Sequence, residues 1–266
     1  MNEKVALKFI KQLKNDPERF TNEGRAYQLL QEYFAGFSIE TLRELLCSQN
    51  NLIRQTALWI VSELGEEAGV LLKEVVPHMD DDDRQIAYYA LEIVADIADG
   101  EYLTDFIRVF TFLEHSDPQM RLSVMLIVSG LSVRRIHEAY RYAVKEKMSN
   151  APHKKMSNDT REKMLNDTYE KMHSAPHEKI LNASHEKGLL SLINMNELTA
   201  SSVTMMINAD DALIRKYGAI AAVKLYKKYP GIINEGVHSD DFDIKELSRT
   251  VVQAKAEEAL IKSLFP

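Results

Sequence analysis

Four segments of the chain repeat one pattern, and this repetition restricts the fold more than any other feature. Each segment has Asn, Asp or Ser near its start, an arginine next, and apolar or small residues three, seven and ten positions after the arginine. Those three positions lie on one face of an α-helix, and Asn, Asp and Ser are residues that cap helix starts. Each segment is therefore predicted to be a helix that packs through this face. The arginines are Arg54, Arg84, Arg121 and Arg215.

The repeats are spaced as helix pairs would be. Other apolar stripes with helical spacing lie between them, at 66–79 and 101–115, and the arginines recur after 30 and then 37 residues. One helix pair cannot bury its apolar face alone, so pairs that repeat at such an interval are expected to stack. We predict an all-α chain, a right-handed α-solenoid of stacked antiparallel helix pairs.

The repeated pattern resembles the HEAT-type helical repeat. Asp or Asn, then Ile or Met before an arginine, then a small residue and an acidic loop carry the resemblance. It covers about 45–132 and 198–230, and capping helices are expected at 1–44 and 232–266.

The resemblance implies a structural role for the acidic residue and the arginine of each unit. The acid would cap the second helix of a pair, and the arginine would bond that cap or neighbouring carbonyls. The second unit departs from the pattern, because Asp83 stands where Ile or Val should precede the arginine. The structural positions implied are Arg54, Arg84, Asp117, Arg121, Asp211 and Arg215.

Between 147 and 187 the chain carries five near-copies of an eight-residue unit, here called the octads. Eight residues turn an α-helix by about 800°, so equivalent residues drift by about 80° per copy and form no single stripe. Pro152 and Pro176 oppose strands, whereas capping residues and early glutamates favour helices of one or two turns. We interpret 147–188 as an insertion, with a packed functional arm as the alternative. The predicted division is 1–146 for the N-terminal repeats, 147–188 for the insertion, and 189–266 for the C-terminal repeats and cap.

Signals for chemistry are absent from the sequence. It contains no GxGxxG, GxxxxGK[ST], HExxH, GxSxG or CxxC motif, so a non-enzymatic protein is predicted. His173 and His177 share a helix face, but no acidic or cysteine ligands accompany them at zinc spacing. We predict no metal and no cofactor. Cys47, the single cysteine, is expected to be a buried structural thiol.

Candidate binding residues are aromatic and acidic. Trp59, Tyr89 and Tyr217 lie on predicted second helices, which solenoids commonly present on the concave side, and aromatic residues favour interface cores. Covering the grooves between helices is the alternative role. Asp82 and Asp241 belong to two acidic loops that would form a rim for a basic partner if both lay on one edge.

The charge balance points to a protein partner. The net charge is −7; 147–188 holds eight basic and six acidic residues, so it contributes +2 and the remainder −9. Nucleic acid and membrane partners are therefore not expected. Because the N-terminus has no signal-peptide pattern, we expect a cytoplasmic location. We predict an adaptor or a stoichiometric inhibitor of the immunity-protein type. Two alternatives stay open: a nucleic-acid-binding protein similar to HEAT-like alkylpurine DNA glycosylases, and a HEAT-like bilin lyase or chaperone.

Overall fold

The structure, a computed structural model, describes residues 3–150 and 182–264, with side chains for 3–142 and 182–258. All regular elements in these ranges are helices, which confirms the predicted all-α class. The chain divides into two compact units, Met1–Asp105 and Phe106–Pro266, which are described separately.

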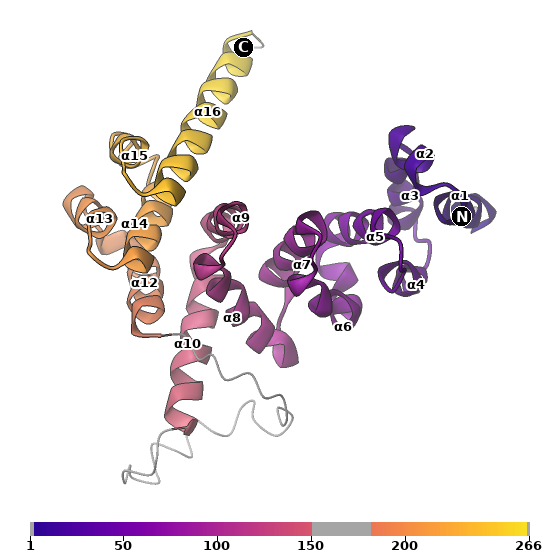
Figure 1. The fold of residues 1–266 in the computed structure, drawn as a ribbon, viewed down its shortest axis with the longest axis horizontal. Coiled ribbons are helices and arrows are strands. Elements are labelled where there is room, and N and C mark those ends of the chain that lie inside the picture. Colours follow the sequence, from indigo (N-terminus) through magenta and orange to yellow (C-terminus); the bar gives the residue numbers. More distant parts are fainter. Residues whose placement is uncertain (1–2, 151–181, 265–266) are drawn as a thin grey trace. The chain divides into compact units, whose positions relative to one another are not determined.

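Unit 1 contains two helices of 14 residues, α5 and α7, each directly preceded by shorter helical segments (Figure 1). The α-helices are α1 (Glu3–Asn15), α2 (Pro17–Asn22), α3 (Arg25–Phe34), α4 (Leu42–Leu46), α5 (Asn51–Leu64), α6 (Leu72–Val75) and α7 (Arg84–Ile97). The 3-10 helices are η1 (Ile39–Thr41), η2 (Gly65–Leu71), η3 (Val76–Asp80) and η4 (Gly100–Tyr102). Helix α8 (Leu103–Thr111) crosses the boundary between the units.

Two helix pairs organise the core of unit 1. Helix α4 packs against α5, the chain through α6 and η3 packs against α7, and α5 packs against α7. Helices α1 to α3 pack on one another, and α2 and α3 reach α5. Each long helix therefore contacts the shorter helices before it and the next long helix, as stacked pairs require.

Unit 2 repeats this short-then-long order. Its elements are η5 (Phe112–Glu114), α9 (Pro118–Gly130), α10 (Val133–Asn150), α12 (Ala183–Ile193), η6 (Met195–Glu197), α13 (Ala200–Ile207), α14 (Ala212–Lys224), α15 (Ile232–Val237) and α16 (Phe242–Leu264). The pairs in contact are η5 with α9, α10 with α12, α13 with α14, and α15 with α16.

Helix α14 is the centre of unit 2. It packs against α9, α12, α13, α15 and α16 (Figure 1), and its buried residues lie all around the helix rather than on one stripe. Small residues permit this close packing: a Cβ on Gly218 would lie 2.7 Å from the backbone nitrogen of Ile207 in α13. Because α14 contacts α9 directly, the two helices are neighbours in space although α10, the octads and α12 separate them in sequence.

The apolar face predicted from the repeat is confirmed. All twelve positions at three, seven and ten residues after the four arginines are buried. They are Ala57, Val61, Leu64, Ala87, Leu91, Val94, Val124, Val128, Leu131, Gly218, Ala222 and Leu225. The helix pairs of both units therefore have the organisation of a HEAT-like α-solenoid.

Three further expectations have different outcomes. Cys47 is exposed, so the prediction of a buried thiol is wrong: the residue follows the last turn of α4, just beyond the buried Leu45 and Leu46. None of the described helices combines the length and apolar character that a bilayer span requires. The octads lie mostly outside the described residues, since only 147–150, at the end of α10, and 182–186, at the start of α12, are described. The division at 146 and 188 stays a prediction.

Candidate functional site

The starts of α5, α7, α9, α12, α14 and α16 share one capping arrangement. A side-chain oxygen at each N-cap accepts hydrogen bonds from backbone N–H groups of the first turn, which otherwise have no partner in the helix. This pattern includes α12, whose start lies inside the last octad. The capping residues are Asn50, Asp83, Asp117, Asn182, Asp211 and Asp241.

Three of the repeat arginines have equivalent contacts. Arg54, Arg121 and Arg215 are each the fourth residue of their helix, and Nη1 of each donates to the backbone carbonyl six residues earlier. The guanidinium also pairs with a carboxylate at the start of another helix. The pairs are Arg54 with Asp81, Arg121 with Asp243, and Arg215 with Asp241.

Arg84 is not equivalent to these arginines. It is the first residue of α7, directly after the capping Asp83, and its side chain is exposed. The fourth residue of α7 is the buried Ala87. The alignment on arginine therefore placed α7 three positions out of register with the other helices. Asp83 instead accepts hydrogen bonds from Asn51 and Gln55 of α5.

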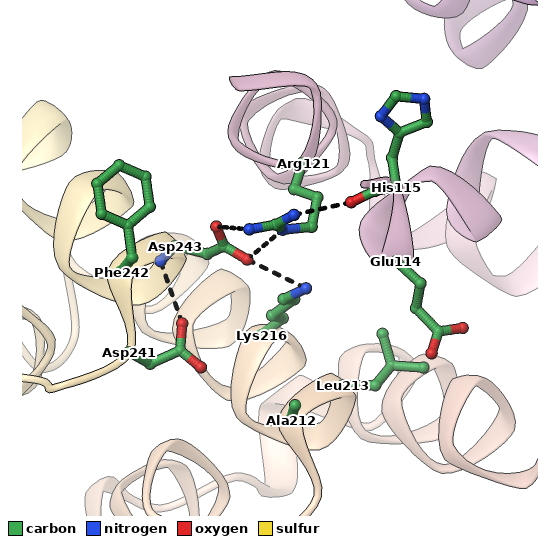
Figure 2. A pocket seen from close by; sticks show the side chains of 9 residues that line it. All are labelled: Glu114, His115, Arg121, Ala212, Leu213, Lys216, Asp241, Phe242 and Asp243. Atoms are coloured by element: carbon green, nitrogen blue, oxygen red, sulfur yellow. Dashed lines mark hydrogen bonds and ion pairs between the residues drawn. The ribbon is translucent and has the colours of Figure 1, made fainter. Parts of the chain in front are cut away.

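Unit 2 contains an open pocket of about 460 Å³ between η5, α9, α14 and α16 (Figure 2). The Asp243 carboxylate, 3% exposed, lies in its wall and accepts from two cations. Arg121 donates Nε to Oδ2 at 2.7 Å and Nη2 to Oδ1 at 3.0 Å. Lys216, 7% exposed, lies 3.1 Å from the same Oδ2 and donates to the Leu113 carbonyl at 2.6 Å.

The polar groups of this pocket are paired with one another. The bond to Asp243 raises the pKa of Arg121, and the Asp241 carboxylate is divided between capping α16 and pairing with Arg215. The buried charges therefore depend on one another, because burying either charge without its partner would cost folding free energy. The pocket therefore links α16 to α9 and α14, and its charges are committed to the fold.

A different surface gathers side chains that are not committed in this way. On α5 and α7, which pack together, half-buried aromatic residues lie beside carboxylates. Trp59 and Glu63 are one turn apart on α5, and Tyr88, Glu92 and Asp96 follow at four-residue intervals on α7. The Tyr88 and Tyr89 rings touch edge to face, with centroids 5.6 Å apart. We call these six residues the acidic–aromatic face: Trp59, Glu63, Tyr88, Tyr89, Glu92 and Asp96.

The carboxylates of this face repel one another. Burial raises the pKa of Glu92, the hydrogen bond from Tyr88 lowers it, and repulsion from Glu63 and Asp96 raises it further. No cation of the described chain is among the groups acting on Glu92. Burial and the neighbouring Glu92 raise the pKa of Tyr88 to about 12, so this hydroxyl stays protonated and donates to the Glu92 carboxylate at 3.2 Å. The face therefore concentrates negative charge beside aromatic rings.

The predicted contact residues separate into two sets. Trp59 and Tyr89 are half-buried members of the acidic–aromatic face, and Asp82 is exposed before α7. Tyr217, in contrast, has no exposed surface, so its side chain is part of the core and not of a binding surface. The reason is Gly188 of α12: a Cβ there would lie 2.0 Å from Cδ2 of Tyr217, so only glycine admits the ring. Asp241 is occupied by α16 and Arg215, as described above.

The sequence interpretation did not identify Glu63, Glu92 and Asp96. The signal was available, because an aromatic residue precedes a carboxylate by four positions in both helices. Metal chemistry finds no support in the described ranges, where no group of three or more His, Cys, Asp or Glu side chains is placed to hold an ion. The octad histidines His173 and His177 lie outside those ranges.

Fold and helix-start geometry define the class: the described chain is an all-helical repeat protein built of packed helix pairs. No protein-family model and no curated protein matches the sequence.

Among solved structures, two engineered proteins from the Northeast Structural Genomics Consortium are similar. The first is 13% identical with a TM-score of 0.34, and the match covers 81% of this chain and 95% of that one. The second is 12% identical with a TM-score of 0.40, covering 94% and 67%. A designed armadillo repeat protein is 13% identical with a TM-score of 0.32, covering 82% and 99%.

Proposed function

We propose that the chain is a non-enzymatic protein-binding module whose acidic–aromatic face receives a basic segment of another protein. It would act as an adaptor or as a stoichiometric inhibitor of the immunity-protein type. Helical repeat proteins commonly present extended surfaces to macromolecules, so the class of function agrees with the fold. The specific partner chemistry rests on the α5–α7 surface alone.

One observation carries the proposal: three carboxylates lie together beside aromatic rings, and burial raises the pKa of Glu92, with repulsion from Glu63 and Asp96 adding to it. A lysine or arginine from a partner would relieve this repulsion. It would also gain a cation–π contact with an aromatic side chain, which contributes about 0.5–2 kcal/mol depending on desolvation. The half-exposed Trp59 and Tyr89 offer apolar area for the core of such an interface.

Trp59 provides a direct experiment, since it is the only tryptophan of the chain. A helical peptide rich in lysine and arginine is titrated into the full chain while tryptophan fluorescence is recorded. We expect saturable 1:1 binding and a change in Trp59 emission, whereas an acidic peptide of equal length gives neither. Rising salt should weaken the binding, because ion pairs at a surface are screened.

A matched pair of variants tests the location. Glu63→Gln, Glu92→Gln and Asp96→Asn together remove three charges from the face, and Glu18→Gln, Glu66→Gln and Glu67→Gln remove three from exposed positions elsewhere in unit 1. Surface pairs contribute about 0.2–1 kcal/mol each, so the first variant should bind the peptide roughly tenfold more weakly. The second should bind as the unmodified chain does, apart from a small change from net charge.

Two results would contradict the proposal. Equal weakening by both variants would mean that the peptide senses only overall charge. Binding of duplex DNA with a steep salt dependence, at affinity above that of the peptide, would instead favour the nucleic-acid alternative. Far-ultraviolet circular dichroism of each variant checks that folding is intact before binding is compared.

A further inference from the structure

The last octad, residues 179–186, gives structural meaning to the octad pattern. Its fourth residue, Asn182, caps α12, and Oδ1 accepts from the N–H groups of Ser184 and His185. Its seventh residue, His185, is 1% exposed. The third helical position that His185 occupies is apolar and buried in four other long helices. Those residues are Ile53, Ile86, Met120 and Ile244.

His185 fits its site through specific contacts. Nδ1 lies 2.9 Å from the Tyr217 hydroxyl, and Nε2 lies 3.3 Å from Oε2 of Glu114. The Tyr217 ring in turn packs over Gly188, the residue where α12 has no Cβ. Ser184 donates to the Asp211 carboxylate at the start of α14. The end of the octad array is therefore the part of α12 that docks on α14.

The earlier octads all have N-cap residue types at the capping position, but only two of the four have histidine at the position that is buried in the last octad. Their fourth residues are Asn150, Asn158, Asn166 and Ser174, all of which are N-cap types. Their seventh residues are His153, Arg161, Tyr169 and His177. Since Lys187 and Gly188 follow the last copy, removing whole octads from that end would bring an earlier copy to the start of α12.

We propose that the octads are interchangeable copies of the first turn of α12, and that the seventh residue decides whether a copy can dock on α14. A histidine copy reproduces the bond to Tyr217, although Pro152 or Pro176 then stands in the place of Ser184, without its bond to Asp211. Arginine would place a charge in a site that is almost closed to water, and tyrosine would overfill a space occupied by an imidazole. The number of octads can then change in steps of eight residues while α12 is retained, provided that a histidine copy comes last. This inference is independent of the acidic–aromatic face.

Pairs of deletions of equal length test the proposal in the full chain. Deleting 163–186 brings Arg161 to the buried position, whereas deleting 155–178 removes as many residues and keeps His185. We expect the first to melt at least roughly 5 °C below the second and to lose hydrogen-exchange protection in 188–193. Adding Arg161→His to the first deletion should restore both. Deleting 179–186 brings His177 to the site and puts Pro176 in the place of Ser184, without its bond to Asp211. Protection in 188–193 should still be kept, as in the deletion of 171–178, which keeps His185.

Several outcomes would overturn the proposal. If the deletions of 163–186 and 155–178 melt alike, the seventh residue does not decide docking. If both unfold, the length of the segment governs α12 and not the identity of its last copy. If the variant lacking 179–186 loses protection in 188–193 while the variant lacking 171–178 keeps it, the copies are not interchangeable. Lack of rescue by Arg161→His would equally exclude the role given to histidine.

Discussion

The two units have the same pattern of capping residue and arginine at helix starts, but the charged groups of this pattern are buried to different extents. In unit 1, Arg54 pairs with Asp81, 27 residues further along, at 3.3 Å with 15% and 16% of the side chains exposed. In unit 2, Arg121 pairs with Asp243, 122 residues away, at 2.7 Å, and only 5% of the Asp243 side chain is exposed. The same pattern thus joins adjacent repeats in unit 1, whereas in unit 2 it joins adjacent repeats through Arg215 and Asp241 and distant segments through Arg121 and Asp243.

The difference follows from α14, which is buried all around its axis. Lys216 and Lys224 on this helix donate to the carbonyls of Leu113 and Ser129, so cations of α14 hold the segment before α9 and the last turn of α9. Burial lowers the pKa of Lys224 to about 8. A helix start whose charges are enclosed depends on every partner, whereas a part-exposed one can exchange a lost partner for water.

The largest effect is expected at Asp243. Asp243→Ala leaves the buried Lys216 and the neighbouring Arg121 without their shared carboxylate, so unfolding of unit 2 should become easier by about 3–5 kcal/mol. Hydrogen exchange resolved to α14 and α16 measures this directly, as a loss of protection in both helices.

A compensated variant serves as the control for Asp243→Ala. Replacing all three charged residues by apolar ones, with Arg121→Met, Lys216→Met and Asp243→Leu, removes the stranded charges and should recover most of the lost protection. Normal hydrogen-exchange protection in Asp243→Ala itself would show that losing the carboxylate of this enclosed triad costs no more stability than losing the Arg54–Asp81 pair in unit 1.

His185 should make unit 2 sensitive to acid. Burial lowers the pKa of His185 to about 4, with Glu114 and Asp211 opposing and Lys216 reinforcing the shift, while Tyr217 bonds its ring. The unfolded state therefore binds more protons between about pH 6.5 and 4, and stability falls as the pH falls through this range. The loss reaches on the order of 3 kcal/mol at the lower end. Urea unfolding at several pH values, followed by circular dichroism, measures it.

His185→Gln is the control, since glutamine is polar and does not titrate. Its unfolding free energy should change less between pH 6.5 and 4 than that of the unmodified chain. Identical pH dependence in the two proteins would assign the acid sensitivity to other groups, such as the capping Asp211, whose pKa is lowered by Ser184.

Local periodicity in the sequence was enough to predict the helices and their buried faces. Burial at positions three, seven and ten follows from helix geometry alone, so no knowledge of distant residues was needed. Contacts across the sequence were a different matter. The burial of Tyr217 depends on Gly188, and the partner of Arg121 lies 122 residues away, and neither pairing has a local signature.

Two other features were missed for local reasons. Aligning the segments on arginine, and not on the capping residue, placed Arg84 with residues three positions deeper in their helices. The octad pattern also hid the start of α12, because Asn182 was interpreted as part of a repeated insertion and not as an N-cap. The capping residue is the more reliable reference, since it defines where the helix begins.

The smallest effect is expected in unit 1, where the comparison can be made with neighbouring residues. Asp81→Ala removes the acceptor for Arg54 and for the N–H of Asp83, so it should cost about 1 kcal/mol of unit 1 stability. Asp82→Ala removes the same charge from an exposed position and should change stability by less than about 0.5 kcal/mol. Trp59 fluorescence during urea unfolding reports both. A loss at Asp81 as large as that at Asp243 would mean that burial does not set the energetic weight of these helix starts.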